Sequence, residues 1–250
     1  MGVDAILAAR RGKTVLAPMA DAPADIAAGY ALQREVAAAM GALPPAGFKI
    51  GATTKQMQDY LGLSGPAAGF VPAGSVNASP LSVRFADFLA PGVECEIAVR
   101  LGADLPAAPC TPEAARAAVA EVMAAIEIVE KRYGDLSELG TPTLIADQVF
   151  HASGVLAPAG DWRGVDLATT RGEIWIDGVS RGAGYGRDLL GHPMQALAWL
   201  AGSPAAQVFG GLKAGQAVWL GSVTPPIWLD GPCEVRVAYE GLGEARVTFR

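Results

Sequence analysis

The chain has 250 residues, of which 51% are hydrophobic and 18% charged, and its formal net charge is −6 with a pI near 5.0. This length and composition suit one large domain, or one domain with a small appendage, around a sizeable core. The acidic balance excludes a nucleic-acid partner, which would need a basic face, and no Lys/Arg run indicates binding to an acidic membrane surface.

Cysteine usage and the apolar segments bear on the compartment. Three cysteines, Cys95, Cys110 and Cys233, are odd in number and widely spaced, which excludes a disulfide framework and fits a reducing cytoplasm. The N-terminal segment lacks the long apolar region of a signal peptide, and the most apolar stretch, residues 114–129, is interrupted by charged residues. We therefore expect a cytoplasmic protein without a membrane span.

The first third of the chain predicts short helices and strands. Apolar spacing and bounding glycines predict helices over 3–10, 22–41 and 54–63, and strands at 47–54, around 70–71 and over 82–88. Thr54 is a candidate cap for the third helix.

The middle of the chain carries the clearest signals. "VECEIAV" opens a predicted strand over 93–101, and Thr111-Pro112-Glu113 is typical of a helix start, from which we expect a helix to about Ala125. Residues 126–132, "IEIVEKR", change to β-branched alternation, which predicts a strand.

The last third is predicted to be mostly strand. Asp177-Gly178 indicates a hairpin over 172–184, residues 192–202 predict a helix, and the remainder to the C-terminus reads as β structure. Because helices and strands mix irregularly, we expect an α+β fold rather than a doubly wound one.

Two carboxylates in the strand at 93–101 raise a chemical question. Glu94 and Glu96 are two residues apart, so both side chains lie on one face of the strand, where like charges are costly unless something offsets them. Glu127 lies 31 residues after Glu96 on the next predicted strand, so the three acids could converge. Three carboxylates suit a hard cation, Mg²⁺ first and Mn²⁺ second, although a solvated face would explain the pattern equally simply.

Other polar residues allow both a plain and a functional interpretation. Lys49 in "GFKIG" is either an edge-strand lysine or a group that moves protons in a cleft. Ser222 and Thr224 in "GSVTPP" either form an ordinary turn or bind a carboxylate. Two histidines, His151 and His192, are too few for a multi-histidine zinc site, and His192 could simply cap the helix that follows.

The motifs together resemble a known family. The segments that carry the resemblance occur in its order and are "GFKIGATT", "VECEIAV", "AIEIVEKRY", "IAD", "LLGHPMQALAWLA", "LKAGQAVWLGSVTP" and "GLGEARVTF". From about residue 25 to the C-terminus the chain resembles the 2-keto-4-pentenoate hydratase and 2-oxo-3-hexenedioate decarboxylase group of the fumarylacetoacetate hydrolase superfamily.

The resemblance implies a fold, a metal and a set of ligands. It implies a largely β, α+β fold. We expect residues 1–65 to form an N-terminal helical segment packed on a catalytic unit over 66–250, with the two parts making one compact unit. It also implies Mg²⁺, held by Glu94, Glu96 and Glu127.

The resemblance also implies roles around the metal. Lys49 falls on the family lysine, and Ser222 and Thr224 fall on a substrate-binding hydroxyl loop. Two stretches depart from the family pattern: Ala67 stands where hydratases of the group carry an aspartate, and "QVFHASG" follows "IAD", which puts His151 at a candidate catalytic position and Ser153 at a substrate-binding one.

The implied activity is that of a metal-dependent lyase. The expected reaction is hydration of 2-hydroxypenta-2,4-dienoate-like acids in aromatic-compound catabolism, by a homo-oligomer acting on a small 2-oxo acid. The alternatives are decarboxylation of a 2-oxo-3-hexenedioate-type diacid, hydrolysis of a β-diketone acid, and a catalytically silent metal-binding partner subunit.

Overall fold

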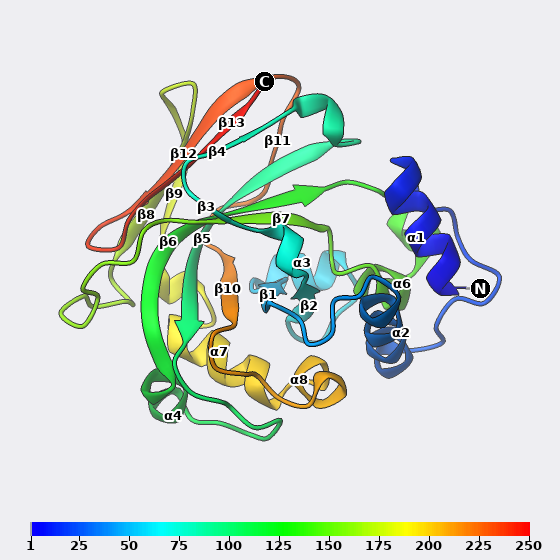
Figure 1. Ribbon diagram of the computed structural model, residues 1–250, viewed down its shortest axis with the longest axis horizontal. Coiled ribbons are helices and arrows are strands. Elements are labelled where there is room, and N and C mark those ends of the chain that lie inside the picture. The colour runs from blue at the N-terminus through cyan, green and yellow to red at the C-terminus, as the bar shows by residue number, and fades with distance from the viewer. Residues whose placement is uncertain (1) are drawn as a thin grey trace.

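Two β-sheets and a set of short helices make up residues 2–250, which are the part of the chain that the computed structural model describes (Figure 1). The helices are α1 (Gly2–Gly12), α2 (Ile26–Ala39), α3 (Lys55–Tyr60), α4 (Pro112–Ala117), α5 (Leu136–Leu139), α6 (Thr141–Ala146), α7 (Pro193–Gly202) and α8 (Pro204–Phe209). The strands are β1 (Gly47–Gly51), β2 (Ala67–Val71), β3 (Val76–Ala78), β4 (Leu81–Val83), β5 (Pro91–Leu101), β6 (Val119–Glu130), β7 (His151–Leu156), β8 (Arg171–Ile176), β9 (Val179–Tyr185), β10 (Ala217–Ser222), β11 (Ile227–Trp228), β12 (Cys233–Tyr239) and β13 (Gly243–Phe249).

The larger sheet carries the site described below. Its strand order is β2-β1-β10-β5-β6-β7-β3, with β11 paired to β5. The pairs β5–β6 and β6–β7 are antiparallel, whereas β1 runs parallel to β10. The smaller sheet has the order β4-β13-β12-β8-β9, and its strands β12 and β13 contact β6. The mixture of helices with two mixed sheets confirms the predicted α+β class.

The helices begin where short polar side chains cap them. Asp25, Thr54 and Thr111 each accept a hydrogen bond from a backbone N–H in the first turn of the helix that follows. At α7 the ring of His192 does this, since its Nδ1 accepts from the Met194 N–H at 2.9 Å. His192 is therefore a capping residue, which is the plainer of the two interpretations that the sequence allows.

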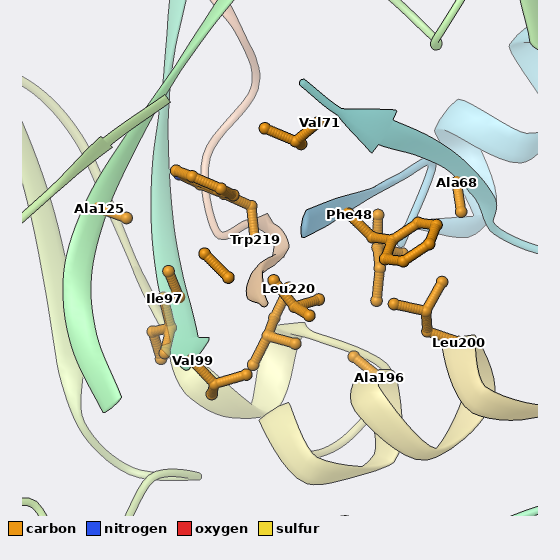
Figure 2. Close-up of a cluster of buried hydrophobic side chains, with 14 of the residues drawn as sticks. Phe48, Ala68, Val71, Ile97, Val99, Ala125, Ala196, Leu200, Trp219 and Leu220 are labelled. Carbon is orange, nitrogen blue, oxygen red and sulfur yellow. The ribbon is translucent and has the colours of Figure 1, made fainter. Parts of the chain in front are cut away.

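The apolar core lies between the larger sheet and the helices beside it. In Figure 2, Trp219 and Leu220 of β10 lie between Ile97 and Val99 of β5 and the ring of Phe48 from β1. Ala196 and Leu200 of α7 close this cluster from the helical side. Packing around β10 thereby fixes the positions of β1, which carries Lys49, and of β5, which carries Glu94 and Glu96.

One predicted element is wrong at its end. The helix expected to reach Ala125 is only α4, Pro112–Ala117, and β6 begins at Val119. Residues 119–125 are rich in Ala, Glu and Met, which favour helices in isolation, but here they pair with β5 and most of their side chains are buried. Pairing with β5 and burial in the core outweigh the weak local preference for a helix.

Candidate metal centre and active-site cleft

Antiparallel pairing of β5 and β6 brings the three predicted acids together. Glu94 and Glu127 are direct cross-strand partners, and Glu96 lies two residues along β5 on the same face. One carboxylate oxygen from each of the three residues lies within 4.8 Å of the others. The two strands are neighbours as the sequence suggested, and the chain reverses direction between them.

The three carboxylates are held out of water and close to one another. Glu96 and Glu127 are fully buried, whereas Glu94 is half-buried. Burial, and then the charge of Glu127, raise the pKa of Glu94 to about 8, and the same two causes raise the pKa of Glu96 well above its usual value. This arrangement is unfavourable for three ionised acids alone, and a divalent cation would offset it.

The hydrogen-bond inventory points the same way. Glu96 Oε2 accepts a hydrogen bond from the Gly221 N–H at 2.9 Å, but Glu96 Oε1 and Glu127 Oε2 are buried without any hydrogen-bond partner among the described residues. Buried carboxylate oxygens are normally satisfied, so these two need a ligand. Oxygen donors from three acids fit Mg²⁺ or Mn²⁺ and leave coordination positions for water or substrate.

Glu127 differs from the other two acids because cationic and imidazole groups surround it. Lys49 Nζ lies 3.4 Å and His151 Nδ1 2.8 Å from Glu127 Oε1. Burial alone would raise the pKa of Glu127, but Lys49 and His151 outweigh it and lower that pKa. Lys49 is the middle residue of β1 and is 2% exposed. Its backbone pairs with Trp219 of β10, and this position in the sheet keeps the Lys49 side chain beside the acids.

His151 occupies a different place from the one expected of a group that faces substrate. It is 1% exposed, does not line the cleft, and uses both ring nitrogens, Nδ1 toward Glu127 and Nε2 toward Ser75 Oγ at 3.1 Å. Burial lowers the pKa of His151 despite the opposing effect of Glu127. The geometry therefore suits a group that orients Glu127 rather than one that touches a substrate.

Ser153 also lies outside the cleft. It pairs with Ile128, so its side chain lies on the opposite face of the sheet from Glu127. There its hydroxyl contacts Asn77 Nδ2 at 2.9 Å and the Ser75 carbonyl at 3.3 Å. The structure thus does not bring Ser153 to the place where the sequence interpretation expected a substrate contact.

A cleft opens over the exposed side of Glu94 and has two chambers. The larger chamber, about 750 Å³, reaches from Lys49 and Glu94 along the end of β6, and the smaller chamber, about 350 Å³, is lined by Ser222 and Thr224. Glu94 borders both chambers, and α3 lies along both through Met57 and Tyr60. Four of the eight residues proposed from the sequence, Lys49, Glu94, Ser222 and Thr224, therefore line the cleft. Glu96, Glu127 and His151 lie directly beneath it, and Ser153 lies outside it.

Sequence reasoning missed the backbone donor and the wall of the larger chamber. The Gly221 N–H reaches Glu96 through a bulge between Trp219 and Ser222, and no residue pattern signals that bulge. Phe150 follows two other non-glycine residues with positive φ, Gln148 and Val149, and lies against Trp228 with 6.3 Å between ring centroids.

A buried ion network holds the turn that carries Phe150. Asp147 precedes that turn and binds Arg10 of α1, Arg132 Nε at 3.1 Å and the Tyr133 hydroxyl at 2.7 Å. Burial would raise the pKa of Asp147, but the two arginines outweigh it and lower that pKa. The network thus ties the first helix to the wall of the larger chamber.

Comparison with known proteins identifies the family. The model of the fumarylacetoacetate (FAA) hydrolase C-terminal family matches residues 10–250. The chain belongs to this family. The curated relatives described next carry the names of enzymes.

Curated relatives carry hydratase and decarboxylase names. A 2-keto-4-pentenoate hydratase of Paraburkholderia phymatum is 31% identical in an alignment that covers 96% of this chain and 93% of that protein. A 2-hydroxyhexa-2,4-dienoate hydratase of Comamonas testosteroni is 31% identical over 81% of this chain and 77% of that protein. A 4-oxalocrotonate decarboxylase of a Pseudomonas species is 30% identical over 79% and 75%.

Solved structures share the fold of this fumarylacetoacetate hydrolase family member. A 4-oxalocrotonate decarboxylase from Pseudomonas putida G7, complexed with magnesium and adipate, superposes with a TM-score of 0.91 at 23% identity over all of this chain and 96% of that one. Among residues 2–250, no helix has the length and apolar character needed to cross a bilayer.

Proposed function

We propose that the chain is a Mg²⁺-dependent hydratase of 2-hydroxypenta-2,4-dienoate-like acids, acting in the breakdown of aromatic compounds. The observation that carries the proposal is the convergence of Glu94, Glu96 and Glu127 beneath a cleft, with two buried carboxylate oxygens unsatisfied. The hydratase relatives at 31% identity support the reaction class.

The residues divide the work as follows. The three acids would hold Mg²⁺, which when bound supplies the positive charge that stabilises a developing enolate oxygen. Lys49, whose buried ammonium lies beside Glu127, would transfer a proton to or from the substrate. Ser222 and Thr224, on the wall of the smaller chamber, would bind the substrate carboxylate.

His151 acts in this proposal by positioning Glu127. Its Nδ1–H would donate to Glu127 Oε1, while its Nε2 lies 3.1 Å from Ser75 Oγ, a hydroxyl that also donates to the Pro72 carbonyl at 3.0 Å. A carboxylate fixed in this way presents its other oxygen to the metal in one orientation.

Decarboxylation of a short 2-oxo diacid is the second candidate. The solved decarboxylase with a TM-score of 0.91, complexed with magnesium and adipate, favours it, because adipate carries two carboxylates. The same three acids and Lys49 would serve, since loss of CO₂ also develops charge on an enolate oxygen.

The test is direct turnover by the purified chain with Mg²⁺. 2-Hydroxypenta-2,4-dienoate and 2-oxohex-3-enedioate are supplied separately, and ultraviolet absorbance and product mass are followed. Water addition to the first supports the hydratase, and CO₂ loss from the second supports the decarboxylase. If neither substrate is turned over although Mg²⁺ is bound, the hydratase and decarboxylase proposals are both refuted. The chain would then be a catalytically silent, metal-binding partner subunit.

We further propose that the protein is a cytoplasmic homo-oligomer. Three free cysteines fit a reducing compartment, and exposed apolar side chains such as Leu43, Val179 and Trp228 are available for contacts between copies. Light scattering after size exclusion measures the assembly, and a mass equal to one 25.6 kDa chain would refute it.

A further inference from the structure

Lys131 lies on the same face of the chain as the metal-site residue Glu127. Side chains alternate along β6, so Glu127, Val129 and Lys131 project to one side, and both Val129 and Lys131 line the larger chamber. The Lys131 N–H donates to the Ala90 carbonyl at 2.9 Å, which continues the pairing with the β5 side past the end of β6. The direction of the Lys131 side chain therefore follows from the strand.

The charges around the larger chamber leave Lys131 without a partner. Of the charged residues on the chamber wall, Lys49 pairs with Glu127, Asp59 pairs with Lys55, and Asp135 accepts the Ser137 N–H at 2.8 Å. The remaining acid on the wall is Glu94, at the metal site. Lys131 is exposed, and within residues 2–250 its ammonium makes no hydrogen bond or ion pair.

An apolar passage separates the Lys131 end of the chamber from the acids. Val129, Phe150 and Trp228 line this passage, and the Trp228 ring sits on Gly92, where a Cβ would approach it to 2.7 Å. Four strand residues advance roughly 14 Å, a separation that the flexible lysine side chain can shorten. The chamber thus has oxygen ligands at one end, an apolar middle and a cation at the other end.

We propose that Lys131 binds the second carboxylate of a short 2-oxo diacid whose 2-oxo acid end lies at Glu94, Glu96 and Glu127. The inference rests on the second candidate of the proposed function, decarboxylation of a short 2-oxo diacid, and adds the residue that binds the far end of that substrate. It favours this candidate over hydration of a monoacid. A distal methyl group would leave the ammonium unpaired, whereas a distal carboxylate would pair with it.

The test compares two ligands that differ only at the distal end. 2-Oxohexanoate and 2-oxohexanedioate have six carbons each, and calorimetry with Mg²⁺ present measures their Kd values for the wild type, Lys131→Met and Lys131→Arg. We expect the wild type to bind the diacid about tenfold more tightly than the monoacid. Lys131→Met should abolish this preference by weakening diacid binding alone, and Lys131→Arg should retain most of it.

The control is a variant with the same total charge as Lys131→Met. Lys213→Met removes another exposed lysine, which pairs with Asp104 outside the cleft, and should leave the ratio of the two Kd values unchanged. An equal ratio in the wild type and Lys131→Met would overturn the inference. If the proposed function is wrong, both ligands should bind equally well with and without Mg²⁺. The role of Lys131 is judged separately, from the ratio of the two Kd values.

Discussion

Glu96 and Glu127 are both fully buried carboxylates, yet their surroundings give them opposite protonation tendencies. Burial and the neighbouring acids raise the pKa of Glu96, and they outweigh the opposing effects of the Gly221 N–H and the Lys49 charge. Glu127 has Lys49 and His151 beside it, and these lower its pKa. In the metal-free protein Glu96 therefore favours the neutral form and Glu127 the charged form.

Isosteric neutralisation should separate the two residues. Glu96→Gln is expected to raise the free energy of unfolding of the metal-free protein at pH 7 by about 1–3 kcal/mol, because it removes a buried acid that must stay protonated above its usual pKa. Glu127→Gln should lower it by about 3 kcal/mol, because it leaves the Lys49 ammonium buried without its partner. Denaturant unfolding with a chelator present measures both.

Metal affinity is the readout that the two variants should share. Each should weaken Mg²⁺ binding at least about 100-fold, measured by titration calorimetry, because each removes a ligand. The metal-site assignment would be abandoned if both variants kept the affinity of the wild type. Glu35→Gln, a change in an exposed acid in the middle of α2, is the matched control and should alter neither quantity.

At the scale of elements, the bulge in β10 decides where a backbone donor points. Gly221 has φ +108° and its N–H meets Glu96 Oε2, while a Cβ at this position would come within 2.5 Å of Thr53 Cγ2. The bulge therefore requires glycine for both conformation and space.

Substitution at the bulge should damage the site from a distance. Gly221→Ala is expected to destabilise the protein by about 2 kcal/mol or more and to weaken Mg²⁺ binding, because the shifted backbone withdraws the donor from Glu96. Thermal unfolding and calorimetry check the two effects. Gly74→Ala, where nothing lies within 4 Å of the added Cβ, is the matched control, and equal effects of the two changes would contradict this role for the bulge.

The same elements show what the sequence could and could not predict. Alternation along β5 correctly placed Glu94 and Glu96 on one face with Cys95 buried on the other, because a strand has a fixed period of two. The predicted end of the helix after Thr111 was wrong because pairing with β5 and burial outweigh the local preference for a helix. The positions of His151 and the Gly221 N–H depend on irregular backbone, a positive-φ turn and a bulge, which leave no periodic signal.

For the whole molecule, the buried acids couple stability to pH and metal. The pKa of Glu94 is raised from 4.5 to about 8, so between these values the folded, metal-free protein binds more protons than the unfolded chain. Its free energy of unfolding must then fall as pH rises through about 8. His151 acts in the opposite direction only near and below pH 6.5, because above that its imidazole is neutral in both states.

The expected result is a lower Tm at pH 9 than at pH 7 in a chelator. Saturating Mg²⁺ should raise Tm more at pH 9 than at pH 7, because binding no longer has to displace protons from the acids. Scanning calorimetry at both values measures the change. Glu94→Gln should reduce the pH dependence without metal, and an unchanged dependence in that variant would show that Glu94 is not its source.

The N-terminal quarter belongs to the same folding unit in our proposal. β1 lies between β10 and β2 in the larger sheet and supplies Lys49, and Arg10 of α1 binds Asp147. We expect a truncated chain of residues 66–250 to be insoluble or to lack a cooperative unfolding transition, because β10 would lose a neighbour. A soluble fragment that unfolds cooperatively would instead support an independent unit from residue 66.

Helix α3 bears on how this protein could change over evolutionary time. It borders both chambers through Met57 and Tyr60, yet none of its side chains is buried. Substitutions there reshape the space around a ligand at little cost in folding free energy, whereas changes on β5 or β6 disturb the sheet itself. Selectivity can therefore drift through α3 while the acids beneath it stay in place, and a library confined to residues 55–60 is the economical route to new substrates.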